Sequence, residues 1–86
     1  MKLQAAIINE QGVDFAVVLV RRHLLNDRSQ ANRTAASFGP VFPGLPIILM
    51  GQDHDGRPNY FGRRDIVDFL SSVQLEAMPW CEYTLR

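Results

Sequence analysis

Apolar residues at the start of the chain form two runs that are separated by a short polar segment. Leu3–Asn9 predicts a strand, and Phe15–Arg21 predicts a second strand. The near-continuous apolar character of the second run predicts burial on both of its faces. Glu10-Gln11-Gly12 supplies the turn, in which Gly12 is free to adopt a positive φ. Because so few residues link the two strands, we expect an antiparallel hairpin.

The pattern then changes to helical spacing. Asp27 can cap a helix, and Gln30 stands three residues later, as in a capping box. The apolar residues that share one face of this helix are Ala31, Ala35 and Phe38. Gly39-Pro40 is typical of a helix end, so the helix should stop there.

Another buried strand, Ile47–Met50, follows a proline-rich segment that ends at Pro46. Because a helix separates this strand from Phe15–Val20, the crossover predicts that the two strands are parallel. Gln52–Gly56 predicts a turn, and Arg57–Phe61 predicts a strand that returns antiparallel to the one before it.

The last part of the chain predicts an amphipathic helix over Arg63–Gln74 and a final edge strand over Trp80–Leu85. The apolar stripe of that helix consists of Ile66, Phe69, Leu70 and Val73. The elements together predict a single α+β domain over residues 1–86, with two layers: a mixed sheet of four or five strands and two helices on one face. Their order is strand, strand, helix, strand, strand, helix and an optional last strand.

Composition narrows the classes of protein that remain. Nine basic and nine acidic side chains give a formal net charge of zero, which argues against a surface built for nucleic acid. The longest unbroken apolar run, Phe15–Val20, is too short to span a bilayer, and the N-terminus has no signal-peptide pattern. We therefore expect a cytoplasmic protein without a membrane partner. The single cysteine, Cys81, excludes an internal disulfide, and we expect it to be a buried small side chain.

Asp53-His54-Asp55-Gly56 is the first group of residues that can carry chemistry. Two carboxylates beside an imidazole can bind a divalent metal or transfer protons. Neighbouring side chains in one turn tend to diverge, however, and one loop rarely closes a metal shell. Asp-Gly is also a strong hairpin-turn signal. We therefore interpret Asp53 and Asp55 first as turn residues, predict no metal, and keep a binding role as the alternative.

Gly62-Arg63-Arg64-Asp65 is the second group. Cations at a helix N-terminus oppose the helix dipole, so Arg63 and Arg64 break a local rule, as functional residues sometimes do. Their guanidinium groups, with Tyr60 just before them, would suit a phosphate or a carboxylate. The structural alternative is that Arg64 pairs with Asp68 one turn later while Arg63 lies in solvent.

The segment Phe42-Pro-Gly-Leu-Pro46, with Ile47–Met50, the following turn and Gly62 before the last helix, resembles the C-terminal half of the thioredoxin fold. In that family a proline precedes a hydrophobic strand, which turns into an edge strand, a glycine and a helix. The resemblance implies that Pro46 is a cis-proline beside a substrate-binding surface. The family's Cys-x-x-Cys is absent from this chain, and Leu3–Val20 has no room for the helix that carries it. The resemblance therefore implies a fold relative without redox chemistry.

No set of nucleophile, base and oxyanion donors can be assembled from the sequence. We therefore expect a non-catalytic module, without a cofactor, that binds another protein or a second copy of itself. The edges of the sheet, expected at Arg57–Phe61 and Trp80–Leu85, are available for such pairing. The alternative is a domain, enzymatic in one version, that binds a small molecule or small anion. That site would centre on Arg63, Arg64, Tyr60 and the turn with Asp53 and Asp55.

Overall fold

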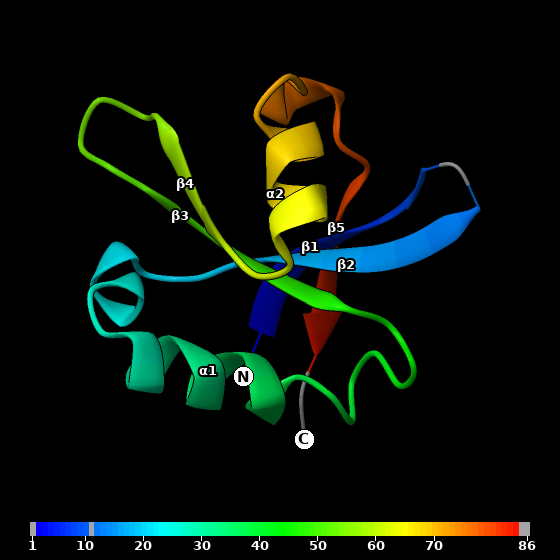
Figure 1. The fold of residues 1–86 in the computed structure, drawn as a ribbon, viewed down its shortest axis with the longest axis horizontal. Coiled ribbons are helices and arrows are strands. Elements are labelled where there is room, and N and C mark those ends of the chain that lie inside the picture. The colour runs from blue at the N-terminus through cyan, green and yellow to red at the C-terminus, as the bar shows by residue number, and fades with distance from the viewer. Residues whose placement is uncertain (1, 11, 85–86) are drawn as a thin grey trace.

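The predicted hairpin at the start of the chain is present in the computed structural model, which describes residues 2–10 and 12–84 (Figure 1). β1 (Lys2–Glu10) and β2 (Val13–Leu19) are antiparallel, and Ala5 lies opposite Val18. Residues 15–18 of β2 are all buried, so the prediction of burial on both faces of this strand is confirmed.

The five strands form one mixed sheet in the order β4-β3-β2-β1-β5. β2 and β3 are parallel, as the predicted crossover requires, and the other neighbours are antiparallel. β4 and β5 are therefore the two edges, although Leu85 of the predicted last strand lies outside the described residues. The remaining strands are β3 (Ile47–Gln52), β4 (Pro58–Phe61) and β5 (Trp80–Thr84).

The first helix, α1 (Arg28–Ser37), begins where the sequence predicts, because the Asp27 carboxylate accepts a hydrogen bond from the Ser29 backbone N–H at 2.9 Å. A short 3₁₀ segment, η1 (Arg22–Leu25), precedes this helix. A second 3₁₀ segment, η2 (Leu75–Ala77), precedes β5. Across the described residues, none of these helices has the length and apolarity needed to cross a membrane.

The second helix, α2 (Arg64–Leu70), is shorter than the predicted helix, which extended to Gln74. Two serines explain the early end. Ser71 Oγ donates a hydrogen bond to the carbonyl of Val67, and Ser72 Oγ donates one to the carbonyl of Phe69. Hydroxyls that bond to nearby backbone carbonyls compete with a continuing helix, so the chain turns here.

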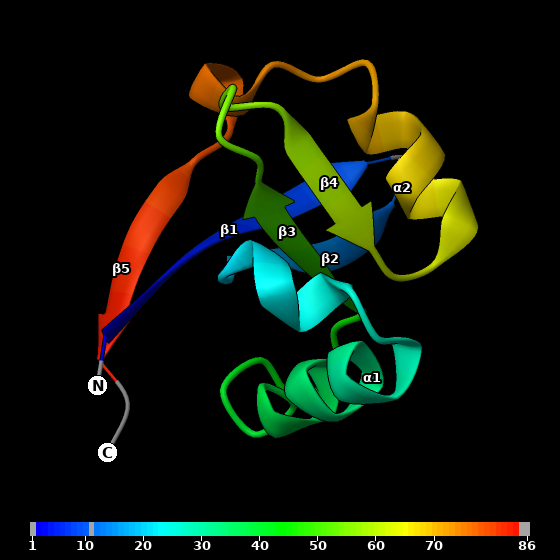
Figure 2. The ribbon, with the colours of Figure 1, turned by 90° about the vertical axis from the view of Figure 1, so that its left-hand side faces the viewer.

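The two helices lie on opposite faces of the sheet (Figures 1 and 2), so the prediction that both cover one face is wrong. Neighbouring residues of β2 show the reason. Val17 belongs to the core beneath α2, whereas Val18 belongs to the core beneath α1, and both are fully buried. Each face of the sheet therefore needs its own cover, and one helical layer cannot supply both. The α+β domain has three layers in place of two.

Gly62 determines the path of the chain from β4 to α2. Its φ is +156°, and a Cβ atom at this position would collide with Ile48 Cδ1 and lie 3.2 Å from the Ile47 carbonyl oxygen. The connection therefore runs directly against the backbone of β3, and only a glycine fits there. From this point the chain enters α2 on the face opposite α1 (Figure 2).

The order β3-β4-α2, with Gly62 before the helix, is the one that the thioredoxin-fold resemblance implies. The peptide bond before Pro46 is nevertheless trans, because the described residues contain no cis bond. The cis-proline that the resemblance implied is therefore wrong for this chain.

Candidate functional site

Asp53 holds the turn between β3 and β4 together. Its Oδ1 accepts hydrogen bonds from the backbone N–H groups of Asp55 at 3.0 Å and Arg57 at 2.9 Å. The Asp53 N–H donates to the carbonyl of Arg57 at 3.0 Å, and the Gly56 N–H donates to the carbonyl of Asp53 at 2.9 Å. One carboxylate oxygen thus satisfies two backbone donors, which is the local turn role that the sequence favoured for this residue.

Asp55 and His54 are exposed at the tip of this turn, where His54 Nε2 lies 4.0 Å from Asp55 Oδ1. Within residues 2–10 and 12–84, no group of three or more His, Cys, Asp or Glu side chains is placed to hold a metal ion. The turn lies at the far end of the β3–β4 hairpin from the start of α2 (Figure 1). The structure therefore does not bring Asp53 and Asp55 together with the arginines that follow β4.

Arg63 is engaged by its neighbour Asp65. Arg63 Nε donates to Asp65 Oδ1 at 3.1 Å, and Nη2 donates to Oδ2 at 2.7 Å. The hydrogen bond with Asp65 raises the pKa of the Arg63 guanidinium, and the same bond lowers the pKa of the Asp65 carboxyl. Residues two apart do not meet inside a helix. They meet here because Arg63 precedes the helix with an extended ψ of 130°.

The predicted pair between Arg64 and Asp68 is wrong. Among the ion pairs of the described residues, Arg63 takes part in one and Arg64 in none. Arg64 instead lines a hollow of about 390 Å³, which we call the β4–α2 hollow, where the connection from β4 to α2 lies beside the start of α1. The residues that line it are Arg28, Tyr60, Phe61, Gly62, Arg64, Val67 and Asp68.

Tyr60 also lines this hollow, but its hydroxyl is buried. The side chain packs against the core beneath α2, and its Oη is buried without a hydrogen-bond partner in the described part of the chain. Burial also raises the pKa of the Tyr60 phenol. Because the hydroxyl is inaccessible, it offers no donor to a ligand.

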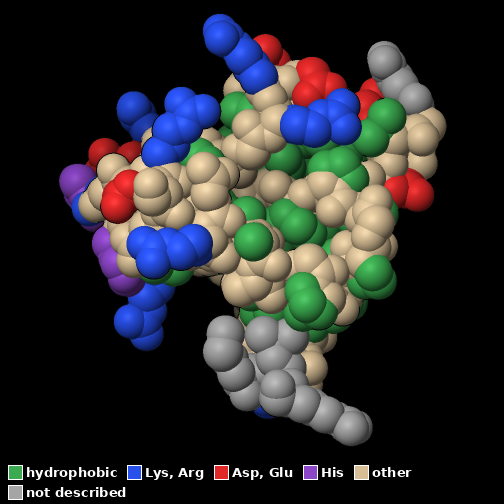
Figure 3. All heavy atoms as spheres, turned by 60° about the horizontal axis from the view of Figure 1, so that its bottom comes forward, with side chains coloured by type: hydrophobic (Ala, Val, Ile, Leu, Met, Phe, Trp, Pro, Cys, Tyr) green, Lys and Arg blue, Asp and Glu red, His purple; other side chains and the backbone are tan. Residues whose placement is uncertain are grey.

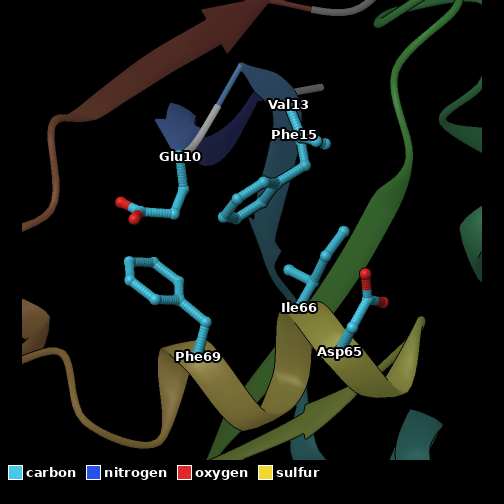
Figure 4. Close-up of a pocket in the computed structure, with 6 residues that line it drawn as sticks. All are labelled: Glu10, Val13, Phe15, Asp65, Ile66 and Phe69. Carbon is cyan, nitrogen blue, oxygen red and sulfur yellow. The ribbon is translucent and has the colours of Figure 1, made fainter.

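A second cavity, of about 250 Å³, lies between the β1–β2 hairpin and α2 (Figure 4). Phe15 and Phe69 form an edge-to-face pair in its wall, with ring centroids 6.4 Å apart. The carboxylate of Glu10 and the ring of Phe69 extend into the same space, whereas Asp65 points away from it (Figure 4). Apolar side chains and acidic residues both line this cavity, and no pattern in the sequence had placed a site there.

The third feature, after the two cavities, is the exposed edge strand β5. Cys81 is exposed, so the expectation of a buried thiol is wrong. Trp80 is half-buried, and its indole Nε1 donates to the carbonyl of Leu75 at 2.9 Å. Met78 is 5 % exposed, which places it in the core beneath α2 rather than on a surface patch.

The polar residues predicted as one site are thus divided among three places. Asp53 and Asp55 form the turn, Arg63 pairs with Asp65, and Arg64 and Tyr60 line the β4–α2 hollow. Arg28 joins Arg64 at that hollow, and the sequence analysis missed it although an arginine directly after the cap Asp27 also opposes the helix dipole. A comparison of the chain with protein-family models, curated proteins and solved structures found no match in any of the three.

Proposed function

We propose that the protein associates with a second copy of itself through antiparallel pairing of their β5 strands. The observation that carries this proposal is the contrast between the two edges of the sheet. β4 has four residues and begins with Pro58, which lacks an N–H group and so limits further pairing. β5 (Trp80–Thr84) contains neither proline nor lysine, and one side of it is unpaired among the described strands. An edge without such protection favours strand addition.

The position of β5 supports the same proposal. The ends of β1 and β5 pair with each other as a two-stranded ribbon beyond the last pairing of β1 with β2 (Figure 2). An isolated pair of strands is marginally stable in water, so a further strand would stabilise it. The ribbon also contacts the rest of the domain through Tyr83, whose ring meets Phe42 edge-on with centroids 5.1 Å apart. The net charge of zero adds no general repulsion between copies.

Symmetry restricts how two β5 strands can pair. In a two-fold antiparallel pair, opposite residues share a face, so the axis must pass between the two copies of one residue, such as Cys81 or Glu82. Centring on Glu82 would place two carboxylates opposite each other, which destabilises a sheet. We therefore favour the arrangement with Cys81 at the centre.

This register gives a direct test. Opposite residues in antiparallel strands have Cα atoms about 4.5–5.5 Å apart, a separation at which a disulfide can form. We expect light scattering after size exclusion to show a dimer as the protein concentration rises. Mild oxidation should then trap a covalent dimer through Cys81, and a reductant should release it.

Three variants distinguish dimerisation through the β5 edge from covalent trapping through the Cys81 thiol. Cys81→Ser should still dimerise but should not be trapped by oxidation. Cys81→Lys should weaken the dimer, because it places two cations at the centre of the edge. Ile7→Lys changes a residue of β1 that is 44 % exposed and lies off the β5 edge, so it should leave the dimer unchanged. A chain that stays monomeric at every concentration, or a dimer that Cys81→Lys does not affect, would contradict the proposal.

A further inference from the structure

Two arginines from distant parts of the chain converge on the β4–α2 hollow. Arg28 is the first residue of α1, and Arg64 is the first residue of α2. The two helices cover opposite faces of the sheet (Figures 1 and 2), yet Arg28 lines the same hollow as the connection from β4 to α2. In residues 2–10 and 12–84, neither arginine forms an ion pair with a carboxylate. Their guanidinium groups therefore remain available to a ligand.

We propose that the β4–α2 hollow binds a phosphoryl group that is carried on a small organic body. A carboxylate is satisfied by one guanidinium fork, whereas two forks from separate elements suit a group with three free oxygens and two charges. The hollow, at about 390 Å³, has room for more than the anion itself. Phe61 and Val67 are the apolar residues of its lining, against which an organic body would pack.

Two nearby acidic residues affect this site differently. Asp65 is neutralised by Arg63 through two hydrogen bonds, so this pair adds little net charge. Asp68 lines the hollow and has no such partner among the described ion pairs. Its carboxylate repels an anion, and it limits the net charge of the hollow to about one positive unit. Binding to exposed arginines beside a carboxylate should therefore be weak, in the millimolar range.

Titration of the labelled protein with inorganic phosphate, phenyl phosphate and benzoate, followed by NMR at constant ionic strength, tests the proposal. We expect phosphate to shift the Gly62 amide and the Nε–H signals of Arg28 and Arg64. Phenyl phosphate should bind more tightly than inorganic phosphate, because its ring meets the apolar residues of the lining. It should also bind more tightly than benzoate, because the two arginines favour the phosphoryl group.

Matched variants connect the binding to this hollow. Arg28→Gln and Arg64→Gln should each weaken phenyl phosphate binding by about threefold or more, as expected for an exposed charge pair. Arg33→Gln, which changes an exposed arginine of α1 outside the hollow, should not weaken it. Asp68→Asn should tighten it, because the variant removes a repelling charge. Equal binding by wild type and both hollow variants, equal loss in Arg33→Gln, or a preference for benzoate would each overturn the proposal.

This site and the proposed interface are at opposite edges of the sheet, since the hollow borders β4 and the interface uses β5. The two proposals can therefore be tested independently of each other. Loss of dimerisation in Cys81→Lys should leave phenyl phosphate binding intact, and Arg64→Gln should leave the dimer intact.

Discussion

Arg63 and Asp65 form a pair that faces solvent at the start of α2, with two hydrogen bonds of 3.1 Å and 2.7 Å. A cation at the first turn of a helix opposes the helix dipole, whereas a carboxylate there is favourable. Both charges of the pair lie at this end of α2. The favourable interaction of the Asp65 carboxylate with the helix dipole therefore offsets the unfavourable interaction of Arg63. This arrangement explains why the sequence tolerates an arginine at the position before the helix.

The pair predicts a pH-dependent effect of the variant Arg63→Gln. The hydrogen bond with Arg63 is the largest cause of the lowered pKa of Asp65. A carboxyl whose folded-state pKa is lowered adds stability above its unfolded-state pKa, and this stability is lost as the pH falls through the folded-state value. We therefore expect Arg63→Gln to melt slightly below wild type at neutral pH. The difference should shrink once the pH falls below about 4, the ordinary range of an aspartate, and should vanish below the lowered pKa of Asp65. Arg33→Gln is the control, and a difference independent of pH would contradict the prediction.

Tyr60→Phe should not destabilise the protein. The hydroxyl of Tyr60 is buried without a described partner. Its removal from water on folding therefore destabilises the folded state. Deleting it should leave the free energy of unfolding unchanged or raise it by up to about 1–2 kcal/mol. Urea denaturation of the variant beside Tyr83→Phe, a second tyrosine that keeps its ring, measures this change. A loss of stability in Tyr60→Phe alone would show that its hydroxyl has a partner.

Gly62→Ala should destabilise the protein by about 1–3 kcal/mol, the usual cost of forcing extra volume into a packed region. The new methyl group would meet the side chain of Ile48 and the backbone of β3. Gly56→Ala is the matched control, because Gly56 has a φ of +83° but open space around its Cβ position. Chemical denaturation should show the larger loss in Gly62→Ala. Equal losses would mean that backbone conformation, and not the contact with β3, determines the effect.

Trp80→Phe should lower the free energy of unfolding by about 1 kcal/mol or more, because it removes the hydrogen bond from Nε1 to the carbonyl of Leu75. That bond links β5 to η2, so the loss should be concentrated at the end of the chain. Hydrogen exchange should become faster in β5 and η2 and stay unchanged in β3. An even increase over the whole sheet would contradict a local role.

The elements and their pairing follow from patterns that act over a few residues. The apolar run of β2, the turn at Asp53 and the cap at Asp27 each depend on local chemistry, and the structure confirms all three. The face that each helix covers is a different kind of property. It depends on the path through Gly62 against Ile48, a contact between residues that are distant in sequence. The buried run in β2 did require cover on both faces, but neither helix stripe specifies its own face.

The candidate site was predicted less well, because it too depends on contacts between residues that are distant in sequence. Arg63 and Arg64 stand out in the sequence because they break a local rule, but the sequence does not say which one is neutralised. The extended backbone at Arg63 allows its side chain to pair with Asp65. Arg64 does not take part in this pair and lines the hollow. Arg28 breaks the same rule, since it is the first residue of α1, but no second arginine adjoins it in the sequence, and its place at the hollow depends on contacts with a distant part of the chain.

The proline at the start of β4 has a consequence for how large an assembly can grow. If two copies join through β5, the combined sheet ends in β4 on both sides, and each of those ends carries Pro58. A pairing that uses the same strand on both partners consumes the only unprotected edge of each described domain. Polymerisation into a fibre would need a second open edge, so such an assembly would close at two copies.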